Sequence, residues 1–201
     1  MIKKIHNFKF VIRNCQKGMT YVELIVVLSI FAVMSSIVLF NHGKFQAKVD
    51  IKNLANDIAL KIVQAQKDAM SGKIQSTRFE IAPAYGVYFN PTENKSFIYF
   101  ADFSNDHIFN DGSCYGECLD NINITKGNTI SEIEECLTGD CSSSASISSS
   151  LSITFTRPNS GASFFPSLSV SSNYIRITVS SSDGSFNGYI KIYPSGRIQV
   201  N

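Results

Sequence analysis

The chain has 201 residues, a length that suits one modest domain together with an anchor. Its formal net charge of +2 is unevenly distributed: the first 18 residues hold five basic side chains and no acidic one, which leaves 13 basic and 16 acidic side chains, a net charge of −3, for the rest. A mildly acidic body argues against broad binding to nucleic acid, and a basic flank before an apolar segment is expected to stay in the cytoplasm.

A long apolar run begins directly after Gly18 and carries one carboxylate, Glu23, near its start. Residues 24–40 hold no charged side chain, and with residues 19–23 they reach the length of about 20 that a membrane span needs. We therefore predict a basic leader over residues 1–18 and a membrane-spanning helix over residues 19–42. An ordinary secretory signal shares the basic flank and the apolar core, but it does not continue into a long helix.

Glu23 is expected to have a partner, because a carboxylate in an apolar membrane segment is costly unless it is paired. The simpler alternative is that its side chain reaches the interface and stays hydrated there.

Residues 43–72 change to an amphipathic pattern with the spacing of one helix face. The apolar positions of this face are Ile51, Leu54, Ile58, Ile62, Ala65 and Ala69. No proline interrupts residues 19–70, and Ser71-Gly72 supplies a stop. The pattern predicts one continuous helix of about 52 residues.

Residues 73–201 are predicted to form a β-rich domain outside the cytoplasm. The strand-like runs are residues 74–81, 85–89, 96–100, 151–156, 174–180 and 186–193. A terminal hairpin is expected around Pro194-Ser195-Gly196, where glycine suits a positive φ, and the serine-rich residues 142–152 are read as a flexible connector. The expected fold is α+β, with the long N-terminal helix packed on one or two antiparallel sheets.

Four cysteines lie within a predicted insertion over residues 102–150: Cys114, Cys118, Cys136 and Cys141. Outside the cytoplasm, an even set in a short stretch favours two disulfides, whose pairing the sequence leaves open. The alternative is a four-thiolate zinc site, since the spacings resemble those of metal ligands. Cys15 lies in the leader.

Oxygen-rich side chains precede Gly112 in the segment that starts at Asp102 and includes His107 and Asp111. Their spacing does not fit a calcium loop, so a solvated turn is the preferred interpretation. The cluster Glu132, Glu134 and Glu135 is read as a solvated face.

No pattern typical of a catalytic site is found in the sequence. After residue 18 it has two histidines, and it lacks a nucleophile elbow and a phosphate loop. We therefore predict that the chain is not an enzyme and needs neither a cofactor nor a metal.

The segment around Gly18 resembles the class III signal sequence of type IV pilins and type II secretion pseudopilins. It reads Lys17-Gly18-Met19-Thr20-Tyr21-Val22-Glu23. The family pattern is a basic leader that ends in glycine, a hydrophobic helix and a glutamate at the fifth mature position. Met19 departs from the phenylalanine that is commonest at the first mature position.

Two later stretches resemble the H-type minor pseudopilins in particular. Residues 155–161, from Phe155 through Pro158 to Gly161, are similar to a Phe-x-x-Pro-x-x-Gly stretch in those proteins. Residues 190–198 are similar to their terminal hairpin.

The resemblance implies that a prepilin peptidase cuts between Gly18 and Met19, that Met19 is then N-methylated, and that Glu23 attracts the N-terminal amine of a neighbouring subunit during assembly. The implied function is that of a minor pseudopilin or minor pilin in a type II secretion pseudopilus or a type IV pilus. Its expected partners are other pilins, the peptidase and an inner-membrane assembly platform. The expected location is the inner membrane, crossed once, with the C-terminal domain outside the cytoplasm. The alternatives are a DNA-binding minor pilin of a DNA-uptake pilus and an anchored extracytoplasmic protein of other function.

Overall fold

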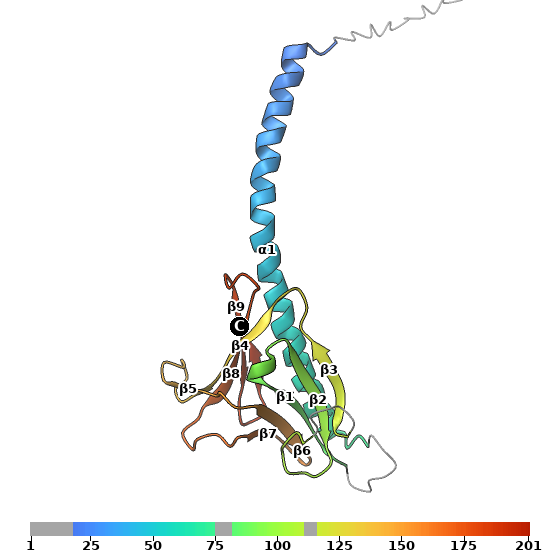
Figure 1. Ribbon diagram of the computed structural model, residues 1–201, viewed down its shortest axis with the longest axis vertical. Helices are drawn as coiled ribbons and strands as arrows, with labels where there is room; N and C mark the ends of the chain where they lie inside the picture. The colour runs from blue at the N-terminus through green and yellow to red at the C-terminus, as the bar shows by residue number, and fades with distance from the viewer. Residues whose placement is uncertain (1–17, 75–81, 111–115) are drawn as a thin grey trace, which may run out of the picture. The chain divides into compact units, whose positions relative to one another are not determined.

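The computed structural model describes residues 18–74, 82–110 and 116–201 (Figure 1). The chain divides after Gly43 into two compact units. The helix α1 runs from Tyr21 to Met70 and has 50 residues. The predicted continuous helix is therefore confirmed. It begins two residues later than Met19 because Thr20 caps it: the Thr20 hydroxyl oxygen accepts from the Glu23 amide at 3.3 Å.

Between Tyr21 and Ile37, the large apolar side chains of α1 are 44 % to 79 % exposed and lie on all sides of the helix. Within the described ranges, α1 is the one helix that is long and apolar enough to cross a membrane. A helix with no polar face belongs in lipid or among other apolar helices.

The second unit contains two antiparallel five-stranded sheets. The first has, in spatial order, β3 (Cys118–Asn123), β2 (Ser96–Asp102), β1 (Ala84–Phe89), β6 (Leu151–Thr156) and β7 (Asn159–Phe165). The second has β10 (Ile198–Val200), β9 (Asn187–Ile192), β8 (Tyr174–Ser180), β4 (Thr129–Cys136) and β5 (Ser144–Ser146). A short 3-10 helix, Pro91–Glu93, joins β1 to β2. The predicted α+β fold, with a long helix and two antiparallel sheets, is confirmed.

The second half of α1 forms one hydrophobic core with both sheets. The predicted face is buried at Ile51, Ile58, Ile62, Ala65 and Ala69, and Leu54 packs on it while partly exposed. Close approach to β9 depends on a glycine, because a Cβ at Gly188 would lie 3.0 Å from Ile51 Cγ2 and 3.4 Å from Ala55 Cβ.

The sequence predicted strands β1, β2, β6, β8, β9 and β10 but not β3, β4, β5 and β7. Apart from Ile74, the run 74–81 lies outside the described residues. The interpretation of residues 142–152 as a flexible connector is wrong, because β5 pairs with β4 and because Leu151 and Ser152 are buried in β6. Backbone pairing with β4 keeps the serine-rich β5 in place, and amino-acid composition does not reveal such pairing.

Candidate functional site

The residues predicted for processing and assembly lie at the start of α1. Gly18 and Met19 precede the helix and are exposed, with Met19 at 66 %. Glu23 is the third helical residue, so Thr20-x-x-Glu23 has the spacing of a capping box. A carboxylate there also lies at the positive end of the helix dipole. The Thr20 cap was missed in the sequence, although the spacing of the two residues signals it.

The Glu23 carboxylate has no ion pair among the residues that the structure describes. Its chemistry is therefore that of an exposed carboxylate at a helix N-terminus, open to a cation from another chain. An N-terminal amine is a cation of this kind.

The two C-terminal stretches that were singled out in the sequence meet on α1. The side-chain amide of Gln66 donates to the carbonyl oxygen of Ser160 at 2.8 Å and to that of Gly196 at 3.2 Å. The Ala162 amide donates to the Pro194 carbonyl oxygen at 3.0 Å. These contacts join the first residues of β7, just after the β6–β7 turn, to the β9–β10 turn of the other sheet, so we call them the turn junction. Gly196 has φ +84°, as the predicted hairpin requires.

A second polar cluster fixes the last turns of α1 to β2. Asp68 accepts from the Tyr99 hydroxyl at 2.6 Å and from Lys73 Nζ at 2.9 Å. Burial alone would raise the pKa of Asp68, but these hydrogen bonds outweigh it and lower that pKa, while burial and the bond to Asp68 raise the pKa of Tyr99. Lys61 lies over the Tyr99 ring and pairs with Asp120 of β3. The cluster is structural, because its groups satisfy one another.

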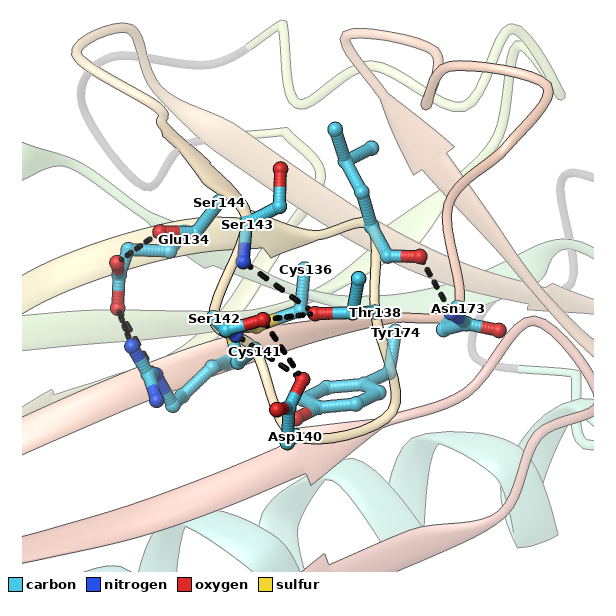
Figure 2. The surroundings of a disulfide bond; sticks show 12 residues. Glu134, Cys136, Thr138, Asp140, Cys141, Ser142, Ser143, Ser144, Asn173 and Tyr174 are labelled. Carbon is cyan, nitrogen blue, oxygen red and sulfur yellow. Dashed lines mark hydrogen bonds and ion pairs between the residues drawn. A yellow bond between two sulfur atoms is a disulfide. The ribbon is translucent and has the colours of Figure 1, made fainter.

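A disulfide joins Cys136 at the end of β4 to Cys141 (Figure 2). The loop that it closes covers Tyr174, whose hydroxyl donates to the Gly139 carbonyl oxygen at 3.2 Å. Hydrogen bonds from the Thr138 and Ser142 groups lower the pKa of Asp140 in this loop to about 2. Cys118 is also disulfide-bonded.

The preference for disulfides is thus confirmed at Cys136–Cys141. Cys114 lies outside the described residues, so its pairing stays a prediction. Among residues 18–74, 82–110 and 116–201, the structure has no group of three histidine, cysteine, aspartate or glutamate side chains that could hold a metal.

We expect the exported protein to show no free thiol among its four predicted disulfide cysteines. The measurement is intact mass after alkylation, with and without prior reduction. Replacing Cys136 and Cys141 together with alanine should lower the free energy of unfolding by about 2 kcal/mol, the loop-closure value for a six-residue loop. Reactive thiols that become protected only when zinc is added would contradict the disulfides.

The interpretation of the glutamate cluster as a solvated face is wrong for two of its members. Glu134 is 7 % exposed and accepts from Arg176 Nε at 2.9 Å and Nη2 at 2.6 Å, because β4 and β8 place the two residues directly opposite each other. Glu135 accepts from the hydroxyls of Ser169 and Ser172. Burial would raise the pKa of Glu135, and these hydrogen bonds lower it. Glu132 is exposed, as predicted.

The segment that starts at Asp102 is not simply a solvated turn either. Asp102 is fully buried, and its carboxylate accepts from the His107 amide at 2.8 Å and from the Ser104 hydroxyl at 3.0 Å. The His107 ring lies 2.8 Å from the Thr154 hydroxyl of β6. The loop also accepts from β1, where the Ala84 amide donates to Asn105 Oδ1 at 3.2 Å. Its side chains therefore bond to its own backbone and to the neighbouring strands, and not to solvent alone. Asp111 and Gly112 lie outside the described residues.

Residues 13–39 match the family model of the prokaryotic N-terminal methylation motif. No curated protein and no solved structure matches the chain. The motif supports a type IV pilin-like protein that is processed as a prepilin, and together with the apolar part of α1 it fits membrane anchoring. Assembly with other pilins and cleavage by a prepilin peptidase are suggested by the same motif.

Proposed function

We propose that the protein is a minor pseudopilin or minor pilin, a structural subunit of a type II secretion pseudopilus or a type IV pilus. In this proposal it is a substrate of enzymes, not an enzyme: a prepilin peptidase cuts between Gly18 and Met19, and the new amine of Met19 is methylated. The observation that carries the proposal is the methylation motif at the head of an apolar helix whose large apolar side chains are exposed from Tyr21 to Ile37.

A second surface supports assembly with other subunits. Leu60, Val63 and Met70 lie on one side of α1 in the second unit and are 65 %, 43 % and 39 % exposed. A groove beside Leu60 is lined by Phe97 and Ile122 together with three polar side chains of α1. Exposed apolar rows of this kind mark surfaces that another protein covers, and in a filament the neighbouring helix would do so.

Residues at the turn junction support the H-type identity within this class. The stretch that ends at Gly161 and the terminal hairpin resemble that group separately in the sequence, and in the structure they contact each other. A shared structural role explains why both stretches occur in one chain.

DNA binding is the second candidate function, and it is favoured by one group of contacts. Lys191 Nζ lies 4.9 Å from the Tyr174 ring centre, and the Arg197 guanidinium carbon lies 3.8 Å from that of Tyr193. Cations beside aromatic rings suit single strands. However, Arg176, the third cation of this sheet face, is neutralised by Glu134. The filament role therefore remains the proposal, and titration of labelled DNA at two salt concentrations distinguishes the two roles.

Processing provides the direct test of the proposal. Mass spectrometry of protein from its native membrane should give an N-terminus at methylated Met19. Gly18→Val should leave the leader attached, because the peptidase accepts a small residue before the cut. Gly43→Ala is the matched control, since added Cβ atoms at Gly18 and at Gly43 both meet nothing within 4 Å in the described residues. A mature start beyond Ala32, or an intact leader where a prepilin peptidase is active, would contradict the proposal.

A further inference from the structure

Three lysines follow the apolar run on α1 at intervals of four residues. Lys44, Lys48 and Lys52 are all exposed, and they come four, eight and twelve residues after Phe40. The exposed Phe45 shares a helix face with Lys48 and Lys52, because positions i, i+3 and i+7 lie on one side. Side chains of a helix lean toward its N-terminus, so these lysines lean toward the apolar run.

Lys48 and Lys52 also line a groove of about 410 Å³ between α1 and the β9–β10 hairpin. Ile51, Phe186 and Val200 form its apolar floor, three asparagines also line it, and no aspartate or glutamate side chain does. The groove lies wholly within the second unit. It therefore joins two ammonium groups to an apolar floor.

Within the described residues, none of these three lysines has a carboxylate partner, although other lysines of the domain do. Lys61 pairs with Asp120 and Lys73 with Asp68. Asp50, the acidic residue of α1 between Lys48 and Lys52, is engaged by Lys126 at 2.6 Å. The positive charge of the lysine row is thus not neutralised by the domain itself.

We propose that this groove binds the headgroup of an anionic phospholipid of the membrane that anchors the chain. The phosphate would lie between the ammonium groups of Lys48 and Lys52, and the glycerol and first methylenes would lie on the apolar floor. Lysines close to a span attract anionic lipid, and long stems let the charge reach the headgroup layer. The proposal rests on membrane anchoring and not on filament assembly. Failure of the lipid test would therefore leave the proposed filament role unaffected, and the reverse is also true.

The test uses the full chain in a mild detergent and native mass spectrometry with added lipid. Wild type should retain phosphatidylglycerol in preference to phosphatidylcholine. The double variant Lys48→Gln/Lys52→Gln should weaken phosphatidylglycerol retention by about 25-fold, because each of the two lysines near an anionic surface contributes about a fivefold factor. The control Lys67→Gln removes an exposed lysine of the same helix outside the groove and should leave retention unchanged.

Hydrogen exchange locates the bound lipid, because occupancy should slow exchange of the amides of Asn187 and Gly188 in the wild type only. Equal retention of the two lipids, equal retention by the double variant, or complete displacement by millimolar inorganic phosphate would overturn the proposal. Circular dichroism of each variant confirms that it folds, as expected for substitutions of exposed side chains.

Discussion

Replacing Glu23 with glutamine is expected to reduce incorporation of the subunit into filaments at least tenfold, while membrane insertion and cleavage after Gly18 persist. Insertion should be equal or better, because an apolar segment loses a charge. Assembly should fail because the incoming helix no longer offers a carboxylate to its neighbour's amine. The electrostatic attraction between two such charges is strongest in a medium of low dielectric constant. The measurement is the amount of subunit in sheared filaments relative to the membrane pool.

The capping box makes glutamine an especially informative substitution. Glutamine serves at the third helical position of such a box as glutamate does, so the variant keeps the local cap and loses only the charge. Thr20→Ala is the matched control, since it removes the hydroxyl acceptor of the Glu23 amide and keeps the charge. That change should cost about 1 kcal/mol of helix stability and leave assembly largely intact. If the glutamine variant assembles like wild type, charge pairing is not the mechanism and Glu23 is a tolerated interfacial residue.

Gly196→Ala is expected to lower the free energy of unfolding of the domain by about 3 kcal/mol or more. A Cβ at this position would lie 2.1 Å from the Ser160 carbonyl oxygen and 2.6 Å from Gln66 Nε2, and the backbone has φ +84°. The substitution therefore adds backbone strain and also forces the β9–β10 turn away from Ser160 and Gln66. Denaturant titration of the full chain in detergent, followed by tyrosine fluorescence, measures the change.

Gly184→Ala separates the two contributions. Gly184 also has a positive φ, +68°, but a Cβ there meets nothing within 4 Å in the described part of the chain. This control should show the backbone cost alone, about 1 kcal/mol. Equal destabilisation by the two substitutions would mean that close packing at the junction contributes little to stability.

Sequence patterns predicted those elements whose structure is determined by neighbouring residues in the chain. The buried face of α1 follows the helical period from Ile51 to Ala69, and Gly196 marks the terminal turn directly. The Thr20-x-x-Glu23 spacing was equally local, but Glu23 was interpreted as a charge in an apolar segment and through its role in the family, and not as part of a helix cap.

The missed features depend on partners that are distant in sequence. Glu134 reads as a surface charge until β8 places Arg176 opposite it, 42 residues later. For the same reason, the meeting of the start of β7 with the β9–β10 turn on Gln66 follows from neither stretch alone.

The second sheet ends on both sides in strands of three residues, β5 and β10. Long unpaired edges are templates for joining one sheet to another, and short edges offer few free backbone groups for this. Three of the six residues in these two edges are Ser144, Ser146 and Gln199, whose side chains are polar. The second sheet therefore offers a neighbouring sheet little to pair with, whereas the first sheet ends in the longer strands β3 and β7 and keeps more backbone groups at its edges.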